Sequence, residues 1–297
     1  MDLIESFKRT IELLRFNLIL FLPPLIIGYL IPVALALAGL YIFVPILIAT
    51  ASSSAPLSVL VPSSVVAIAV IIVLALLGYA YVLAGWAGMN KNAALTGRTM
   101  FNDFWVGTST YFGRILGGII VLSVIYLLLI VVGVAATFAV ILPLVMRFQP
   151  TGITPGGFPT IPSGLPEISR IIAAVGNTLG VWLVIITFIG LVFLFTVFWV
   201  QSVALDDVGV LRGFGRSISF VKNNFKTTLG IAALYVIATG FTQSIFPGGG
   251  GGGGGAGGSF SLVIPAPLQA IFQLLITTFF MLYMFVIYTD RTKKAPQ

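Results

Sequence analysis

The segment ILGGIIVLSVIYLLLIVVGVAATFAVILPLVM, residues 115–146, decides the fold class of this chain. It contains no Asp, Glu, Lys or Arg, and it is longer than the roughly 20 apolar residues with which a helix crosses a bilayer. A charge at the centre of a span costs about 3 kcal/mol on insertion scales, so an uncharged interior suits a membrane-crossing helix. The segment therefore predicts a transmembrane helix.

Five further segments share these properties, although residues 228–246 are shorter and more polar. Together they give six predicted spans, at residues 17–41, 61–89, 115–146, 171–203, 228–246 and 265–288. Only 8% of the 297 residues are charged and the mean hydropathy is +1.14, whereas soluble domains carry roughly 25% charged residues. The sequence thus predicts an all-α, polytopic membrane protein that forms a single membrane domain over residues 1–297.

Proline interrupts the first span. Pro23, Pro24, Pro32 and Pro45 each lack the backbone donor that a helix interior uses, so we expect the span to bend or break near Pro32. The apolar run is too long for a signal peptide, and no small-residue cleavage site follows it closely. We therefore expect the first span to be retained.

Basic residues gather on one side of the predicted spans. On that side lie Lys8, Arg9, Arg15, Lys91, Arg98, Arg114, Arg212, Arg216, Lys222, Lys226, Arg291, Lys293 and Lys294, and on the other Arg147 and Arg170. The positive-inside rule then predicts a multi-pass protein of the cell membrane with both termini in the cytoplasm and the glycine-rich loop at 248–258 outside. This orientation, with attraction to anionic lipids, accounts for the net charge of +7. Membrane lipids, and not nucleic acid, are the expected partners.

The composition removes the usual catalytic and metal-binding side chains. The chain has no His and no Cys, so Ser–His or Cys–His pairs and thiolate or imidazole metal sites are impossible. The adjacent Asp206 and Asp207 are a weak signal for acid–base chemistry. The glycine tract lacks the strand and the Lys-Ser/Thr pair of a phosphate-binding loop, which favours a flexible linker. We expect no enzyme activity, no cofactor and no metal.

An amphipathic pattern occurs three times on the basic side. Its first copy has apolar residues at spacings of three and four, typical of a helix lying in the membrane interface: Ile4, Phe7, Ile11, Leu14 and Leu18. The pattern returns 207 positions later, at Leu211, Phe214, Ile218, Val221 and Phe225, with the matching pairs Arg9–Arg216, Thr10–Ser217, Arg15–Lys222 and Asn17–Asn224. A weaker copy lies 97 positions after the first, at Phe101, Phe104, Thr108, Tyr111 and Ile115, with Arg114 in place of Asn17.

Two predicted spans follow each copy of this pattern. This order predicts three repeats, near residues 1–97, 98–207 and 208–297, each an interfacial amphipathic helix plus a transmembrane hairpin. The alternative is that any helix entering a membrane from a basic surface has such a pattern.

Several short motifs carry a resemblance to a known family. The segment ALDDVGVL at 204–211 places an acidic pair at the end of a span, and Arg216-Ser217 and Asn224-Phe225 follow it. With the closing IYTDR at 287–291, these motifs resemble the membrane domain joined to some glycerophosphodiester phosphodiesterases, and its stand-alone archaeal and bacterial relatives. The resemblance covers most of the chain and implies a six-helix bundle. It implies no catalytic activity, because the phosphodiesterase domain of that family is a separate soluble unit.

The candidate interaction residues are Asp206, Asp207, Arg216, Ser217, Asn224, Asn17, Asp290 and Arg291. The acidic pair could bind a cation, although carboxylates at a helix start more often favour its free N–H groups. Arg216 could hold a lipid phosphate or pair with one of the aspartates. The two asparagines could line a polar path or bond between helices at the membrane edge.

Glutamine and tryptophan supply two further signals within the spans. The glutamines Gln201, Gln243, Gln269 and Gln273 could line a substrate cavity or bond between helices. The tryptophans Trp86, Trp105 and Trp199 lie near predicted span ends, which is typical of an interfacial aromatic belt.

Two functional hypotheses follow. The first is a non-catalytic scaffold or accessory protein that acts through its interfacial helices on lipids or on protein partners in the membrane. The second is a small-molecule or lipid transporter, for which we expect a cavity among the spans lined by glutamine. The absence of an ionisable group inside the spans favours the first, because coupled transporters usually need one.

Overall fold

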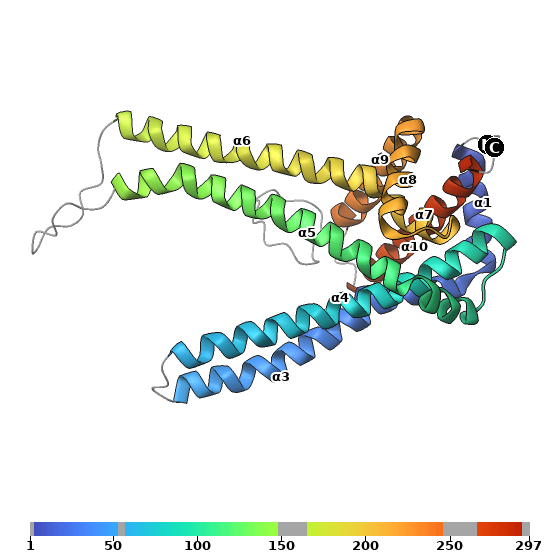
Figure 1. The fold of residues 1–297 in the computed structure, drawn as a ribbon, viewed down its shortest axis with the longest axis horizontal. Helices are drawn as coiled ribbons and strands as arrows, with labels where there is room; N and C mark the ends of the chain where they lie inside the picture. Colours follow the sequence, from blue (N-terminus) through green and yellow to red (C-terminus); the bar gives the residue numbers. More distant parts are fainter. Residues whose placement is uncertain (1–2, 53–56, 148–164, 246–265, 293–297) are drawn as a thin grey trace, which may run out of the picture. The chain divides into compact units, whose positions relative to one another are not determined.

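The computed structural model describes residues 3–52, 57–147, 165–245 and 266–292, and within these ranges the chain is helical without a strand (Figure 1). The elements are α1 (Leu3–Phe16), η1 (Leu18–Phe21), α2 (Leu22–Leu25), η2 (Ile26–Leu30), α3 (Ile31–Ser52), α4 (Leu57–Thr96), α5 (Phe101–Arg147), α6 (Leu165–Thr196), α7 (Trp199–Leu205), α8 (Val210–Asn223), α9 (Phe225–Ile245) and α10 (Ala266–Thr292). The glycine-rich loop lies outside the described residues. The chain forms two compact units, a larger one of Met1–Ile119 with Thr196–Gln297 and a smaller one of Ile120–Phe195.

Six helical segments in the described part of the chain are long and apolar enough to cross a membrane. They are Leu18–Tyr41, Ile68–Thr96, Phe101–Leu142, Val175–Leu205, Phe225–Thr242 and Leu268–Thr292. Each overlaps one span predicted from the sequence. The prediction of an all-α membrane protein with six spans is therefore confirmed.

The irregular part of the first span lies upstream of Pro32. A 3-10 turn (η1), one α-turn (α2) and a π-turn (η2) come before α3 begins at Ile31. Pro32 is the second residue of α3, where a missing donor costs little. Because Pro32 cannot donate to the carbonyl of Gly28, the turn before it departs from α-helical geometry. The predicted break is thus present before Pro32, and α3 continues through Pro45.

Three helices form the core of the larger unit. α4, α7 and α10 pack on one another, and the deeply buried apolar side chains concentrate in the second halves of α4 and α10 and in α7. Glycine lets α5 approach this core, since a Cβ at Gly88 of α4 would lie 2.5 Å from the Cα of Gly107 on α5. Trp86 and Trp199 are buried here rather than placed in an interfacial belt, whereas Trp105 is exposed.

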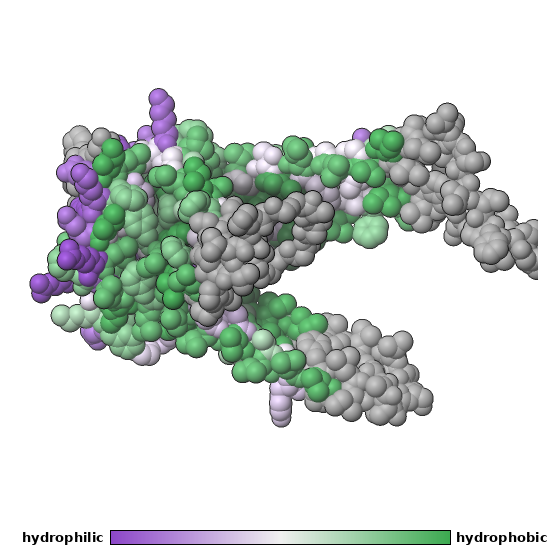
Figure 2. Space-filling model, turned by 180° about the vertical axis from the view of Figure 1, so that it is seen from behind, coloured by the Kyte–Doolittle hydropathy of each residue, from purple (hydrophilic) through white to green (hydrophobic). Residues whose placement is uncertain are grey.

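The ends of these three helices, with α1, α8 and the starts of α5 and α9, form what we call the basic end of the larger unit. Figure 2 shows hydrophilic side chains gathered at this end of the larger unit and hydrophobic side chains along its helices. The core helices thus carry their charged residues at their termini, as spans without interior charge require.

α1 packs on α10, and α8 packs on α7. They bury equivalent faces, 207 positions apart: Ser6, Thr10 and Leu13 in α1, and Gly213, Ser217 and Phe220 in α8. The apolar residues by which the pattern was recognised in the sequence lie largely on the opposite, exposed face of each helix. Ile4, for example, is 65% exposed and Leu211 is 77% exposed. In a bilayer such a face contacts lipid.

The second copy of the pattern has no separate interfacial helix. Residues 101–115 are the start of α5, a single continuous helix of 47 residues (Figure 1). Its buried residues Phe104, Thr108, Tyr111 and Ile115 match the buried face of α1 at a displacement of 98 rather than 97. Ile115 then corresponds to Asn17, and isoleucine lacks the side-chain amide with which asparagine competes for backbone hydrogen bonds. The helix consequently continues at Ile115.

The smaller unit is a hairpin of α6 and the part of α5 after Ile119 (Figure 1). Nε1 of Trp182 donates to Oγ1 of Thr137 at 3.0 Å. Ile185 fills the space beside Gly133, where a Cβ would lie 2.6 Å from its Cδ1.

Candidate functional site

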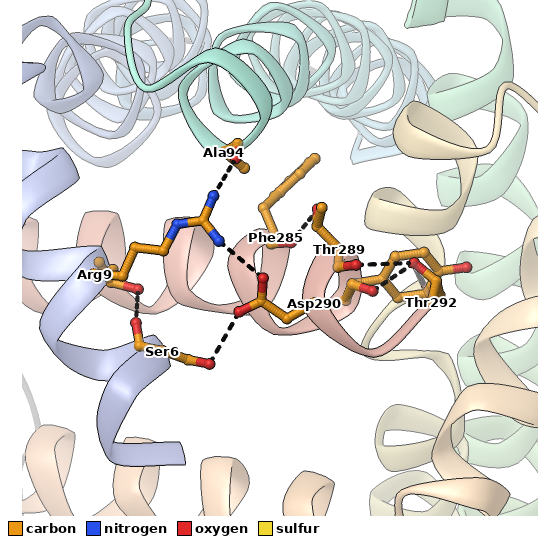
Figure 3. A network of polar contacts seen from close by, with 9 residues as sticks. Ser6, Arg9, Ala94, Phe285, Thr289, Asp290 and Thr292 are labelled. Carbon is orange, nitrogen blue, oxygen red and sulfur yellow. Dashed lines mark hydrogen bonds and ion pairs between the residues drawn. The ribbon is translucent and has the colours of Figure 1, made fainter. Parts of the chain in front are cut away.

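Asp290, near the end of α10, bonds to two side chains of α1 at the basic end (Figure 3). Its Oδ1 lies 2.9 Å from Nη1 of Arg9 on α1, and its Oδ2 accepts a hydrogen bond of 3.2 Å from Oγ of Ser6. The other nitrogen of the guanidinium, Nη2, donates to the carbonyl of Ala94 on α4 at 3.1 Å. Arg9 therefore links the ends of α10 and α4 while it holds α1 in place.

Asp206 makes the corresponding link between α7 and α10. Its Oδ2 lies 2.8 Å from Nη1 of Arg216 on α8 and accepts a hydrogen bond of 2.7 Å from the hydroxyl of Tyr288 on α10. The hydrogen bond to Asp206 raises the pKa of Arg216, so this guanidinium stays charged. Arg216 thus pairs with one of the aspartates considered from the sequence.

Lys91 connects α4 to the end of α7. Its Nζ donates to the carbonyl of Ala204 at 2.7 Å and to the hydroxyl of Tyr111 at 2.8 Å. The last carbonyls of a helix have no partner within the helix and carry its negative dipole end. The ammonium group of Lys91 therefore gives the Ala204 carbonyl a hydrogen-bond partner and balances the negative end of the α7 dipole.

Asp207 has a different environment from its neighbour Asp206. Its backbone is left-handed, with φ of 52°, and its side chain is 65% exposed and paired with Arg114 of α5. The hydrogen bond from Arg114, followed by the charge of that guanidinium, holds the pKa of the Asp207 carboxyl below its usual range. Neither aspartate caps α8, which begins at Val210 without a side-chain cap.

The two asparagines sit at equivalent helix breaks. Asn17, with φ −129° and ψ 55°, separates α1 from η1, and Asn224, with φ −126° and ψ 35°, separates α8 from α9. Each side-chain amide donates to the carbonyl four residues before it, at 2.7 Å to Leu13 and at 3.1 Å to Phe220. They end helices rather than line a polar path.

Asn17 also fixes the connection between α4 and α5. Its amide donates to the carbonyl of Gly97 at 3.0 Å, and its Oδ1 accepts from the backbone N–H of Thr99 at 2.7 Å. Ser217 is buried, and its Oγ accepts from the backbone N–H of Phe198 at 3.2 Å. Arg291 is exposed at the end of α10.

The structure brings the three predicted aspartates, both asparagines, Arg216 and Ser217 to the basic end. There, ion pairs between aspartate and arginine side chains connect the ends of the helices. Sequence reasoning had not named Lys91, Tyr111, Arg114 or Tyr288 as members of this network. Tyr111 and Arg114 lie in the second copy of the amphipathic pattern and Tyr288 in the closing IYTDR motif, but neither pattern identifies a partner.

A pocket of about 330 Å³ opens among the spans of the larger unit. Its wall consists of Pro24, Ile27, Gly28, Tyr29, Tyr79, Trp86, Gln273, Leu274 and Thr277, from α2, η2, α4 and α10. One of the four glutamines considered from the sequence, Gln273, therefore lines a cavity. Gln201 instead is buried in the core beside Met281.

A second hollow, of about 460 Å³, has only apolar side chains and the ring of Tyr283 in its wall. It lies between α1, α9 and α10, with Phe7, Leu234 and Phe279 among its lining residues. A groove of this composition suits the hydrocarbon chain of a lipid.

The fold and these sites define an all-helical, multi-pass membrane protein. The chain belongs to the family described as a domain of unknown function (DUF7847), which matches residues 1–290. No curated protein and no solved structure matches the chain. The resemblance to the membrane domain of glycerophosphodiester phosphodiesterases accordingly stays a prediction.

Proposed function

We propose that this protein is a non-catalytic scaffold or accessory component of the cell membrane that acts through its basic end. In this proposal both termini and the basic end face the cytoplasm and the glycine-rich loop faces outward. The partners are anionic membrane lipids and other proteins of the membrane.

The observation that carries the proposal is a set of exposed basic residues beside an exposed apolar face. Outside the three ion pairs, the exposed basic residues of the described basic end are Lys8, Arg15, Arg98, Arg212, Lys222, Lys226 and Arg291. Ile4 and Leu211 are exposed on α1 and α8. Helices with this combination lie at the boundary of headgroups and acyl chains and attract anionic lipid.

The test is lipid retention during purification. A variant with Arg15, Arg212 and Lys222 replaced by Gln should lose several-fold of the anionic lipid that mass spectrometry finds on the wild-type chain. Replacing Arg147 and Arg170 by Gln is the matched control, and it should leave retention unchanged. Equal retention by all three proteins would exclude the proposal.

The pocket lined by Gln273 favours a second candidate, a transporter of small molecules or lipids. Broken spans with Gly or Pro in the middle form the binding sites of many secondary transporters, and η2 is such a break. The measurement is solute flux into liposomes that contain the purified chain. Saturable flux supports transport, and flux equal to that of empty liposomes excludes it.

The motif residues on which the resemblance to the membrane domain of glycerophosphodiester phosphodiesterases rests have structural roles in this chain. The motif residues Asp206 and Arg216 pair with each other, Ser217 accepts a buried backbone N–H, and Asn224 ends a helix. These roles hold helices together, in keeping with a non-catalytic domain.

A further inference from the structure

One wall of the pocket among the spans is the π-turn η2, which contributes Ile27, Gly28 and Tyr29. π-Turns inside membrane helices are rare and occur frequently at functional sites. Here Gly28 has no neighbouring atom within 4 Å of the place of a Cβ. The turn thus presents backbone and the ring of Tyr29 to an open space rather than to a packed neighbour.

Each polar side chain of this pocket carries a hydrogen-bond donor, although the hydroxyls and the amide can also accept. Trp86 is 4% exposed, and its Nε1–H, which can only donate, has no partner among the described residues. Tyr29, Tyr79 and Gln273 bring two hydroxyls and an amide. A buried donor without an acceptor is rare in native proteins, so this set fits a molecule that supplies acceptors.

The pocket also carries no charge. None of its lining residues is ionised at neutral pH, so nothing in the wall compensates a charged ligand, and burying an uncompensated charge is costly. Gln273 is exposed in the first third of α10, within a candidate membrane span, where hydrocarbon offers its amide no partner. A neutral polar group in the pocket would supply one.

From these features we infer that the pocket binds a neutral, membrane-soluble molecule whose head is a flat ring bearing carbonyl acceptors, the chemistry of a quinone. Tyr29, Tyr79 and Trp86 supply aromatic walls for the ring. Gln273 donates to a carbonyl oxygen, and an apolar tail extends into the bilayer. A volume of about 330 Å³ admits one such ring. This inference deepens the second proposed function because it concerns the same pocket, but it claims binding alone.

The experiment measures quenching of tryptophan fluorescence in the full chain in lipid nanodiscs, with a benzoquinone bearing a decyl tail as the probe. Wild type should show a saturable component beyond the linear quenching caused by partitioning of the probe into the bilayer. Gln273→Leu should weaken binding roughly tenfold, the effect of one hydrogen bond in an apolar site. Tyr79→Phe should also weaken binding of the quinone.

The matched control is Gln269→Leu, which removes a glutamine one turn away on α10 that does not line the pocket. It should bind the quinone like wild type. Decylbenzene, which has the ring and tail without carbonyls, and the decanoate anion should show no saturable component.

Three results would overturn the inference: no saturable quinone binding by wild type, saturable binding of decylbenzene or decanoate equal to that of the quinone, or equal effects of Gln269→Leu and Gln273→Leu. Binding without flux would exclude transport and leave the inference intact. Flux of another solute without quinone binding would exclude the inference and leave transport intact.

Discussion

The three aspartates at the basic end each pair with an arginine from a different helix, but in different environments. The exposed fraction of the side chain is 10% for Asp290, 19% for Asp206 and 65% for Asp207. Exposed ion pairs contribute little to stability, whereas removing one partner of a buried pair leaves a charge without compensation. The contribution should therefore fall in the order Asp290, Asp206, Asp207.

Asp290→Asn should lower the free energy of unfolding in detergent by about 1–3 kcal/mol, because Arg9 loses a charged hydrogen-bond partner. Arg291→Gln, at the exposed neighbouring residue, is the control and should change the free energy of unfolding by less than about 0.5 kcal/mol. If the two variants unfolded alike, the Arg9–Asp290 pair would not contribute as described. Combining Asp290→Asn with Arg9→Gln should recover part of the loss.

The pKa of the Asp207 carboxyl predicts a dependence of stability on pH. A carboxylate whose pKa is depressed in the folded state stabilises the fold above its unfolded pKa, about 3.9, and loses that contribution as pH falls through the folded pKa. Arg114→Gln removes the cause of the depression. Lowering the pH from about 5 to about 3 should thus reduce the thermal stability of wild type more than that of Arg114→Gln. Equal losses would contradict this assignment.

At the scale of elements, α1 and α8 end at an asparagine, whereas α5 continues at the corresponding residue. Asn17 makes three hydrogen bonds with its side chain, to Leu13, Gly97 and Thr99. For Asn224 the bond is to Phe220 within its own helix. The asparagine sets the helix end in both cases, but only Asn17 also fixes a neighbouring connection.

Asn17→Ala should therefore destabilise the protein more than Asn224→Ala. We expect a loss of about 2–3 kcal/mol for Asn17→Ala and about 1 kcal/mol for Asn224→Ala, at about 1 kcal/mol for each net hydrogen bond. Chemical unfolding in detergent, followed by circular dichroism, measures both values. A larger loss for Asn224→Ala would refute the role given to the connection between α4 and α5.

The close contact of α4 and α5 depends on glycine. Gly88→Ala would place a Cβ 2.5 Å from the Cα of Gly107 and 2.8 Å from the carbonyl oxygen of Asp103. The helices must then separate, and we expect a loss of about 1–3 kcal/mol in the free energy of unfolding.

Gly113→Ala, on the same helix as Gly107, is the matched control for this contact. No atom lies within 4 Å of its Cβ position, so it should stabilise the protein by up to about 1 kcal/mol through helix propensity. A loss of stability in Gly113→Ala as large as that in Gly88→Ala would show that the contact is not the cause.

At the scale of the molecule, the first and last helices of the larger unit pack against each other. α1, from the first copy of the pattern, packs on α10, the last helix, as α8 packs on α7. Arg9 and Arg216 occupy equivalent positions and pair with Asp290 and Asp206, respectively. The equivalent pairs relate the first and third copies, and equivalent burial relates all three; the three repeats of about 1–97, 98–207 and 208–297 stay a proposal. Gly107 takes the place of the arginine in the second copy and packs against Gly88.

The proposed orientation is testable because the chain contains no Cys. A single Cys at Gly252 should react with a membrane-impermeant maleimide in intact cells, and a Cys at Lys8 should react only after lysis. This result follows from the basic residues that the positive-inside rule keeps in the cytoplasm. The reverse labelling pattern would invert the orientation, and the unmodified chain is the control for non-specific reaction.

The sequence alone determined that the chain is helical and that it has about six segments able to cross a membrane, and it predicts that most of the charge lies on one side. These properties are local, because a helix in lipid satisfies its own backbone hydrogen bonds and its apolar length is read directly from the residues. The break before Pro32 was also predictable, since proline removes a specific hydrogen bond.

Only the tertiary structure decided which face of each helix is buried, which residues pair and where the pocket lies. Arg9 and Asp290 are 281 positions apart, and the pocket combines η2, α4 and α10, so no local pattern contains either site. The same pattern in α1 and α5 also gives a separate helix in one case and a continuous helix in the other. The difference arises because Asn17 turns its amide to backbone groups of its own helix and of the α4–α5 connection, while Ile115 is buried by packing.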